Sequence, residues 1–218
     1  NPVWTEPVLT ATLARLTELP VVLLGNFRPE TSGIVGILGA GGALDPIGLA
    51  RERVFDHRSD DARRSFLAFI RAAVAVKRLK GQTLGIFGGR SLGMITATAD
   101  PSQWQRVFGV DIDHVDQLAI VEAAKEISSV EVPRHTSWLL DRLGKVEFGG
   151  LLDRQALERQ IRRYLATKTI MEERGYDFVG VKCQPELSNG YALQCVAHML
   201  LNGFYDADGK KTSFCPRL

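Results

Sequence analysis

The sequence predicts an α/β fold with parallel sheets and helices on both faces. Short apolar runs alternate along the chain with longer amphipathic segments of helical period. The apolar runs are nearly continuous, which is typical of parallel strands buried on both sides. Alternation of strands and helices favours right-handed crossovers. We therefore expect two Rossmann-like or flavodoxin-like units, the first of them incomplete.

Residues 1–80 are interpreted as the C-terminal part of a first α/β domain. Ser59 is placed to cap a strong helix that Gly81 ends, and acidic residues in its first turn with basic residues in its last suit the helix dipole. The expected elements are a helix over 8–19, a strand over 21–25, a closely packed helix or loop over 32–45, a short strand over 51–57 and a helix over 59–80.

Residues 81–218 are interpreted as a second α/β domain. Asp153 is placed to cap a long helix that Gly175 ends. The expected elements are a strand over 83–87, a helix from 101 through 107, a strand over 110–116, a helix over 118–127, an irregular stretch over 128–150 with a short helix around 138–143, a helix over 153–174, a strand over 177–183 and a helix over 191–202.

Composition excludes several classes of protein. The 218 residues carry a formal net charge of +2, so no strong field favours nucleic acid or an anionic membrane. Hydrophobic residues make up 45% and charged residues 24%, which is ordinary for a globular protein, and no run of eighteen apolar residues predicts a membrane span. Three irregularly spaced cysteines indicate reduced thiols in the cytoplasm rather than a disulfide framework.

The stretch "GIFGGRSLGM" raises the question of what comes close to its backbone. It lacks the Lys-Ser or Lys-Thr of a Walker loop, and its G-G-x-x-x-G spacing does not fit the dinucleotide fingerprint. Two interpretations stay open: a sharp turn that needs glycine, or a ligand contact at the carboxyl end of a buried strand. In the second, Ser91 offers a hydroxyl, Arg90 a charge and Met94 an apolar wall.

Beyond these local patterns, "GGRSLGM" followed by "DPSQWQRVFGVDIDHVDQ", and later "YDFVGVKCQPELSNGYALQCVAHMLLN", resemble the second domain of the L-fucose isomerase family, relatives of which handle L-arabinose. "LPVVLLGNFRPETSGIVGILGAGGALDPIG" resembles the end of that family's first domain. The resemblance covers nearly the whole chain in the same order. It implies aldose–ketose isomerisation through a cis-enediol, with Mn²⁺ chelating the sugar oxygens, in a homo-oligomer that is typically a hexamer.

The resemblance also implies particular site residues. The turn from Ser91 to Met94 matches a segment that lines the sugar pocket, and Gln184 matches a substrate contact. The family's metal-binding carboxylates and His would lie beyond residue 218, and Leu118-Ala119 stands where an acidic residue is expected. We therefore expect a central fragment without the C-terminal catalytic domain and without metal ligands of its own.

For the acidic residue Glu186 and for the acidic stretch from Asp111 to Asp116, two interpretations stay open in each case. Glu186 follows a strand end and Pro185, where it could serve as a catalytic acid or be a solvated loop residue. The stretch from Asp111 to Asp116 could bind a hard cation or simply end a strand. For the whole chain, the alternative to an isomerase is a non-catalytic sugar-binding or structural α/β domain.

Overall fold

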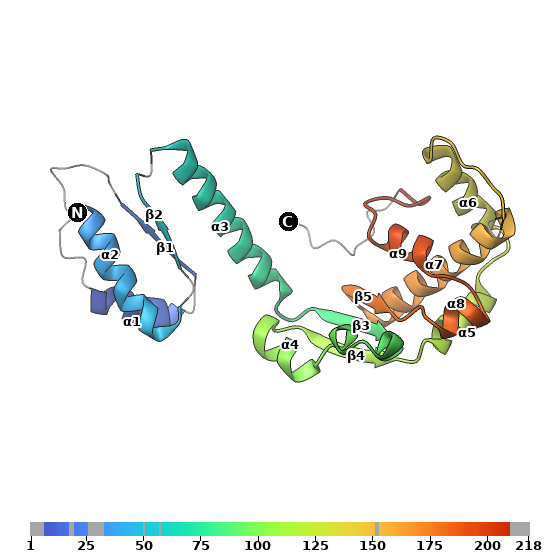
Figure 1. The fold of residues 1–218 in the computed structure, drawn as a ribbon, viewed down its shortest axis with the longest axis horizontal. Helices are drawn as coiled ribbons and strands as arrows, with labels where there is room; N and C mark the ends of the chain where they lie inside the picture. The colour runs from blue at the N-terminus through green and yellow to red at the C-terminus, as the bar shows by residue number, and fades with distance from the viewer. Residues whose placement is uncertain are drawn as a thin grey trace. The chain divides into compact units, whose positions relative to one another are not determined.

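The computed structural model describes residues 7–17, 20–25, 33–49, 51–56, 58–150 and 153–209 (Figure 1). Contacts divide the chain into two compact units, Asn1–Lys77 and Arg78–Leu218. None of the helices in the described ranges combines the length and the apolar character that crossing a bilayer requires.

The first unit is built around a pair of parallel strands. Its helices and strands are α1 (Pro7–Thr17), β1 (Val21–Leu24), α2 (Gly33–Leu44), η1 (Asp45–Ile47), β2 (Arg51–Val54) and α3 (Asp60–Leu79). The segment for which helix or loop was open is a helix, α2, and its buried residues Ile37, Ala40 and Leu44 recur at helical spacing. Short strands also form within the predicted ranges 21–25 and 51–57, as β1 and β2, and pair in parallel. Residue 57 lies outside the described residues.

The long helix α3 begins where its sequence predicts. The Ser59 hydroxyl accepts the backbone N–H of Ala62 at 3.1 Å, which satisfies one donor of the first turn. Ala62 is the one buried residue of α3 among those described, whereas Leu67, Ile70 and Val74 are exposed.

The second unit contains a three-stranded sheet. Its elements are β3 (Thr83–Phe87), η2 (Ser91–Gly93), η3 (Ile95–Ala97), α4 (Pro101–Phe108), β4 (Asp111–Val115), α5 (Leu118–Glu126), α6 (Glu131–Arg142), α7 (Arg154–Arg174), β5 (Phe178–Val181), α8 (Glu186–Gly190) and α9 (Cys195–Leu201). The strand order is β4-β3-β5 and both pairings are parallel. Phe87 at the end of β3 lies opposite Val115 and Val181. With two all-parallel sheets flanked by helices, the predicted α/β class is confirmed.

Different helices cover the two faces of this sheet (Figure 1). Phe87 and Val115 belong to the main core, which α5, α7 and α9 complete. Leu84 and Ile112 alternate with them along the strands and pack on the opposite face with Trp104 of α4. Successive side chains of a strand point to opposite faces, so residues three apart, such as Leu84 and Phe87, lie on opposite sides of the sheet.

The prediction of an irregular stretch over 128–150 is wrong for much of its length. A twelve-residue helix, α6, begins at Glu131, well before the short helix expected around Trp138. Pro133 lies in its first turn, where a residue without a backbone N–H costs little. Val132 and Leu139 are buried in the main core, so packing stabilises a helix that the local sequence signals weakly.

The predicted start of the helix over 191–202 is also wrong. The structure has α8 directly after Pro185, and a separate, shorter α9 that begins at Cys195. Tyr191 ends α8 with a backbone conformation that is not helical (φ −139°, ψ −83°). The break leaves the backbone N–H of Val196 to donate to Gln160 of α7 at 3.2 Å.

Candidate functional site

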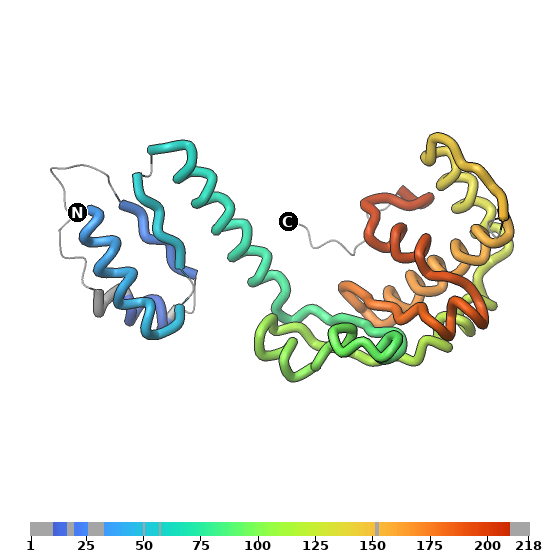
Figure 2. The backbone as a smooth tube through the Cα atoms, viewed as in Figure 1, coloured from blue at the N-terminus to red at the C-terminus, as the bar shows by residue number. Residues whose placement is uncertain are grey.

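After the carboxyl ends of β3 and β5, the chain continues on opposite faces of the sheet. From β3 it passes through η2 and η3 into α4 on one face (Figure 2). From β5 it passes through α8 into α9, which packs on the other face. Open α/β sheets bind ligands at such a topological switch point.

At Gly88 the structure shows what comes close to the backbone of the glycine-rich stretch. The parallel ladder continues past β3, because the backbone N–H of Gly88 donates to Val115 at 2.8 Å and that of Lys182 to Phe87 at 2.9 Å. Gly88 has φ +87°, and an added Cβ would lie 2.8 Å from Gln117 Oε1 and 3.0 Å from the Cβ of Lys182. Its glycine is therefore needed both for conformation and for the close approach of two neighbouring strand ends.

The turn after β3 and the segment after β5 meet at this edge. The hydroxyl of Ser91 donates to the backbone carbonyl of Gln184 at 3.3 Å. The side chain of Gln184 is exposed, as are those of Arg90 and Met94. The residues predicted for a sugar pocket on these two segments therefore share one edge of the sheet.

Glu186 lies at the same edge, in an ion pair. Lys182, which is mostly buried, donates to its carboxylate at 2.6 Å. This bond holds the pKa of Glu186 below its ordinary value, and a hydrogen bond from Gln117 acts in the same direction. A carboxylate kept ionised in this way is a good hydrogen-bond acceptor and holds no proton to donate at neutral pH. The geometry thus favours binding over acid catalysis for Glu186.

Two residues of this site, Gln117 and Lys182, do not stand out from the sequence as functional. Gln117 directly follows the strand predicted over 110–116, and Lys182 lies next to the last residue of the strand predicted over 177–183. A place at a strand end is the signal that could have found them. Together with the turn after β3, they bring polar side chains to the edge from all three strands.

The acidic stretch of β4 is tied into the fold. Asp113 accepts hydrogen bonds from the hydroxyl of Tyr176 and, at 3.4 Å, from Arg174. Asp116 accepts the backbone N–H of Leu118 at 2.8 Å and so holds the start of α5. These contacts favour the interpretation of a strand end over that of a cation site.

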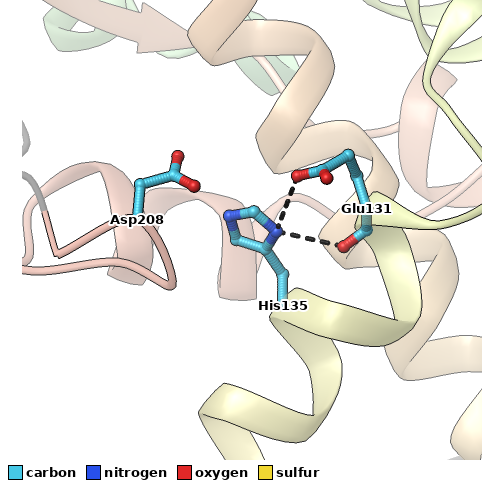
Figure 3. Close-up of side chains that lie close together, drawn as sticks. All are labelled: Glu131, His135 and Asp208. Carbon is cyan, nitrogen blue, oxygen red and sulfur yellow. Dashed lines mark hydrogen bonds and ion pairs between the residues drawn. The ribbon is translucent and has the colours of Figure 1, made fainter.

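A second cluster, formed by Glu131, His135 and Asp208, lies at α6 and at the turn after α9 (Figure 3). One nitrogen of the imidazole and one oxygen of each carboxylate lie within 4.8 Å of one another. Within the described ranges, these are the residues whose grouping could hold a metal ion. None of the three stands out from the sequence alone.

No family model matches the chain, and no curated protein matches its sequence. The resemblance to the L-fucose isomerase family therefore stays a prediction.

Proposed function

We propose that this chain supplies substrate-binding residues to a metal-dependent aldose–ketose isomerase of the L-fucose and L-arabinose type. The contact between Ser91 and Gln184 at the topological switch point carries the proposal. It supports a single binding edge to which the segments after β3 and β5 both contribute.

The residues at this edge suit a polyhydroxylated ligand. The amide of Gln184 can donate and accept, the hydroxyl of Ser91 can do both, and the carboxylate of Glu186 accepts. Sugar hydroxyls need both kinds of partner. Met94, which is 47% exposed, offers an apolar surface for the carbon skeleton. Arg90 adds a charged guanidinium whose N–H groups can donate hydrogen bonds to the oxygens of the sugar.

Isomerisation moves a proton between C1 and C2, which needs an acid and a base near those carbons. The residues at the sheet edge do not fit Mn²⁺, because Glu186 is neutralised by Lys182 and Asp116 is engaged by the N–H of Leu118. We assign no step to the metal, and its ligands would come from outside this edge. A hexameric assembly, which the resemblance implies, and a cytoplasmic location, which the irregularly spaced cysteines indicate, complete the proposal.

The alternative is a sugar-binding module without catalysis. The pairing of Glu186 with Lys182 favours it, since the carboxylate is already satisfied and its lowered pKa makes it a weak base. The isomerase and the sugar-binding module would use the same edge of the sheet, but only the isomerase would convert the sugar.

The test compares Gln184→Ala with the control Gln155→Ala, another exposed Gln of the same unit. Binding of L-fucose and of D-arabinose is measured by calorimetry, and ketose formation is measured with Mn²⁺ present, both on the intact protein. Loss of hydrogen bonds to the sugar costs about 1–3 kcal/mol, so kcat/KM should fall roughly ten- to a hundredfold in Gln184→Ala alone.

The outcomes separate the two functions. Turnover that weakens in Gln184→Ala supports the isomerase, and binding without turnover supports the sugar-binding module. A protein that neither binds nor converts these sugars, or equal effects of the two substitutions, would contradict both.

A further inference from the structure

The cluster of Glu131, His135 and Asp208 is separate from the proposed sugar site. Glu131 and His135 are four residues apart on α6 and therefore share one face of that helix. Asp208 comes from the turn after α9. Figure 3 shows the imidazole between the two carboxylates, with its outer nitrogen directed toward Asp208. No residue from the ends of β3 or β5 takes part.

The imidazole of His135 is held in one tautomer. Its Nδ1 lies 3.0 Å from the backbone carbonyl oxygen of Glu131 and 3.7 Å from a carboxylate oxygen of the same residue. Because a carbonyl only accepts, Nδ1 carries the hydrogen. The neutral ring then has its lone pair on Nε2. A backbone carbonyl that orients an imidazole through its other nitrogen is the usual support of a metal-bound histidine.

The lone pair of His135 is buried and unused. The side chain is 1% exposed, and Nε2 has no hydrogen-bond partner among the residues that the structure describes. A buried polar atom without a partner is costly, so a partner at this position would be stabilising. A proton or a metal ion can satisfy a lone pair.

The charged groups around His135 carry a net negative charge. Three carboxylates, Glu131, Asp206 and Asp208, face two fixed cations, Arg134 and Lys168, which leaves one negative charge in excess. A compact divalent ion is favoured by such an excess.

Asp206 anchors the turn that carries Asp208. It accepts the hydroxyl of Tyr164 at 2.8 Å, pairs with Lys168 and accepts the backbone N–H of Asp208 at 2.9 Å. Asp208 is thereby positioned before any ion arrives, which lowers the cost of assembling a site.

Arg134 shows where positive charge is stabilised. Its Nη2 donates both to Glu131 and, at 2.6 Å, to Asp208, so one guanidinium nitrogen bridges the two carboxylates. The side chain is 40% exposed, and its Nη1 also donates to the backbone carbonyl of Ala207 at 3.2 Å. A metal ion would compete with the guanidinium for the same carboxylate oxygens.

We propose that Glu131, His135 and Asp208 form a binding site for a divalent first-row transition metal such as Zn²⁺. One imidazole nitrogen and two carboxylate oxygens are a donor set suited to these ions, whereas Ca²⁺ and Mg²⁺ prefer oxygen alone. Three protein ligands leave a coordination position for water or for a ligand. The ion would join α6 to the turn after α9. The proposal is independent of the sugar-binding edge.

The test titrates tag-free intact protein with Zn²⁺ by calorimetry and with Co²⁺ by visible absorption. Asp208→Asn and Glu131→Gln each remove one ligand and should weaken binding by about tenfold or more. Glu122→Gln is the matched control, since Glu122 is also paired with a cation three residues later, and it should leave binding unchanged. Arg134→Gln removes the competing cation and should tighten binding. Circular dichroism checks that each variant is folded.

Several results would overturn the site. They are absence of binding by the native protein, binding by Arg134→Gln alone, equal binding by Asp208→Asn and the native protein, and a thiolate-to-cobalt charge-transfer band, which would place the ion on cysteines. Saturable Co²⁺ absorption without that band, lost in His135→Gln and retained in Glu122→Gln, supports it.

Discussion

The hydroxyl of Ser91 donates a hydrogen bond of 3.3 Å to the backbone carbonyl of Gln184, across 93 residues of sequence. The bond joins the connection after the central strand β3 to the connection after β5. Parallel strands place their carboxyl ends on one edge, and the ladder fixes which segments meet there. The contact thereby brings the two sequence segments with the strongest functional signal into one site.

Substitution of Gly88 should disturb this edge, whereas substitution of Gly89 should not. Gly88→Ala forces a Cβ onto a residue with φ +87° and against Gln117 and Lys182, but a Cβ on Gly89 meets nothing within 4 Å. We expect Gly88→Ala to lower the free energy of unfolding by about 1–3 kcal/mol and Gly89→Ala by less than about 0.5 kcal/mol. Urea denaturation measures both, and equal losses would contradict the assigned close approach.

Two strand glycines should also differ in their tolerance. A Cβ on Gly85 would lie 2.3 Å from Cδ2 of the buried Tyr176, whereas a Cβ on Gly180 of the neighbouring strand meets nothing within 4 Å. Overpacking a core costs about 1–3 kcal/mol, so Gly85→Ala should be destabilising by that amount. Gly180→Ala should be neutral or slightly stabilising. Thermal unfolding compares the two, and an unaffected Gly85→Ala would mean that Tyr176 does not pack there.

The ion pair between Lys168 and Asp206 should matter far more than an exposed pair. The side chain of Asp206 is 0% exposed and that of Lys168 is 12% exposed. Lys168→Met leaves a buried carboxylate without its cation, at a cost of about 3 kcal/mol. The exposed pair of Lys125 and Glu122 provides the control, since Lys125→Met should cost about 0.5 kcal/mol or less.

A double variant distinguishes this cause from loss of packing. Adding Asp206→Asn to Lys168→Met removes the unpaired charge and should restore part of the lost stability in chemical denaturation. If the double variant is as unstable as the sum of its parts, the charge is not the cause.

Acid should weaken the turn that contains Asp208. Hydrogen bonds from Arg134 and then Lys168 lower the pKa of Asp208 to about 2, below the unfolded value of about 3.9. A lowered folded pKa means stability that is fully present above about pH 4 and lost as pH falls through about 2. After allowance for solvent screening, the contribution is about 1 kcal/mol.

The measurement is the free energy of unfolding between pH 2 and pH 6. Asp208→Asn should be less stable than the native protein at pH 6 and should lose about 1 kcal/mol less on acidification. Parallel profiles for the native protein and Asp208→Asn would show that the ion pairs of the turn contribute nothing.

The order and kind of most elements could be predicted from the sequence, because caps, glycine stops and apolar runs act locally. The helix that Asp153 begins is an example: its carboxylate accepts the N–H of Ala156, and Gly175 ends the helix with φ +68°. The meeting of Ser91 and Gln184 at one edge was also predictable, since it needs only two parallel strands and their ends. Local signals failed where packing decided, at α6 and at the break between α8 and α9.

What the sequence by itself determined is therefore the α/β class, the positions of most strands and helices, and the strand ends where the candidate site residues gather. Only the tertiary structure decided that Gln117 and Lys182 approach Gly88, and that Asp208 meets His135. Arg134 and Asp208 are 74 residues apart, and no periodicity or spacing encodes that pairing. Such contacts depend on how helices pack over a sheet, which is a property of the whole core and not of any one segment.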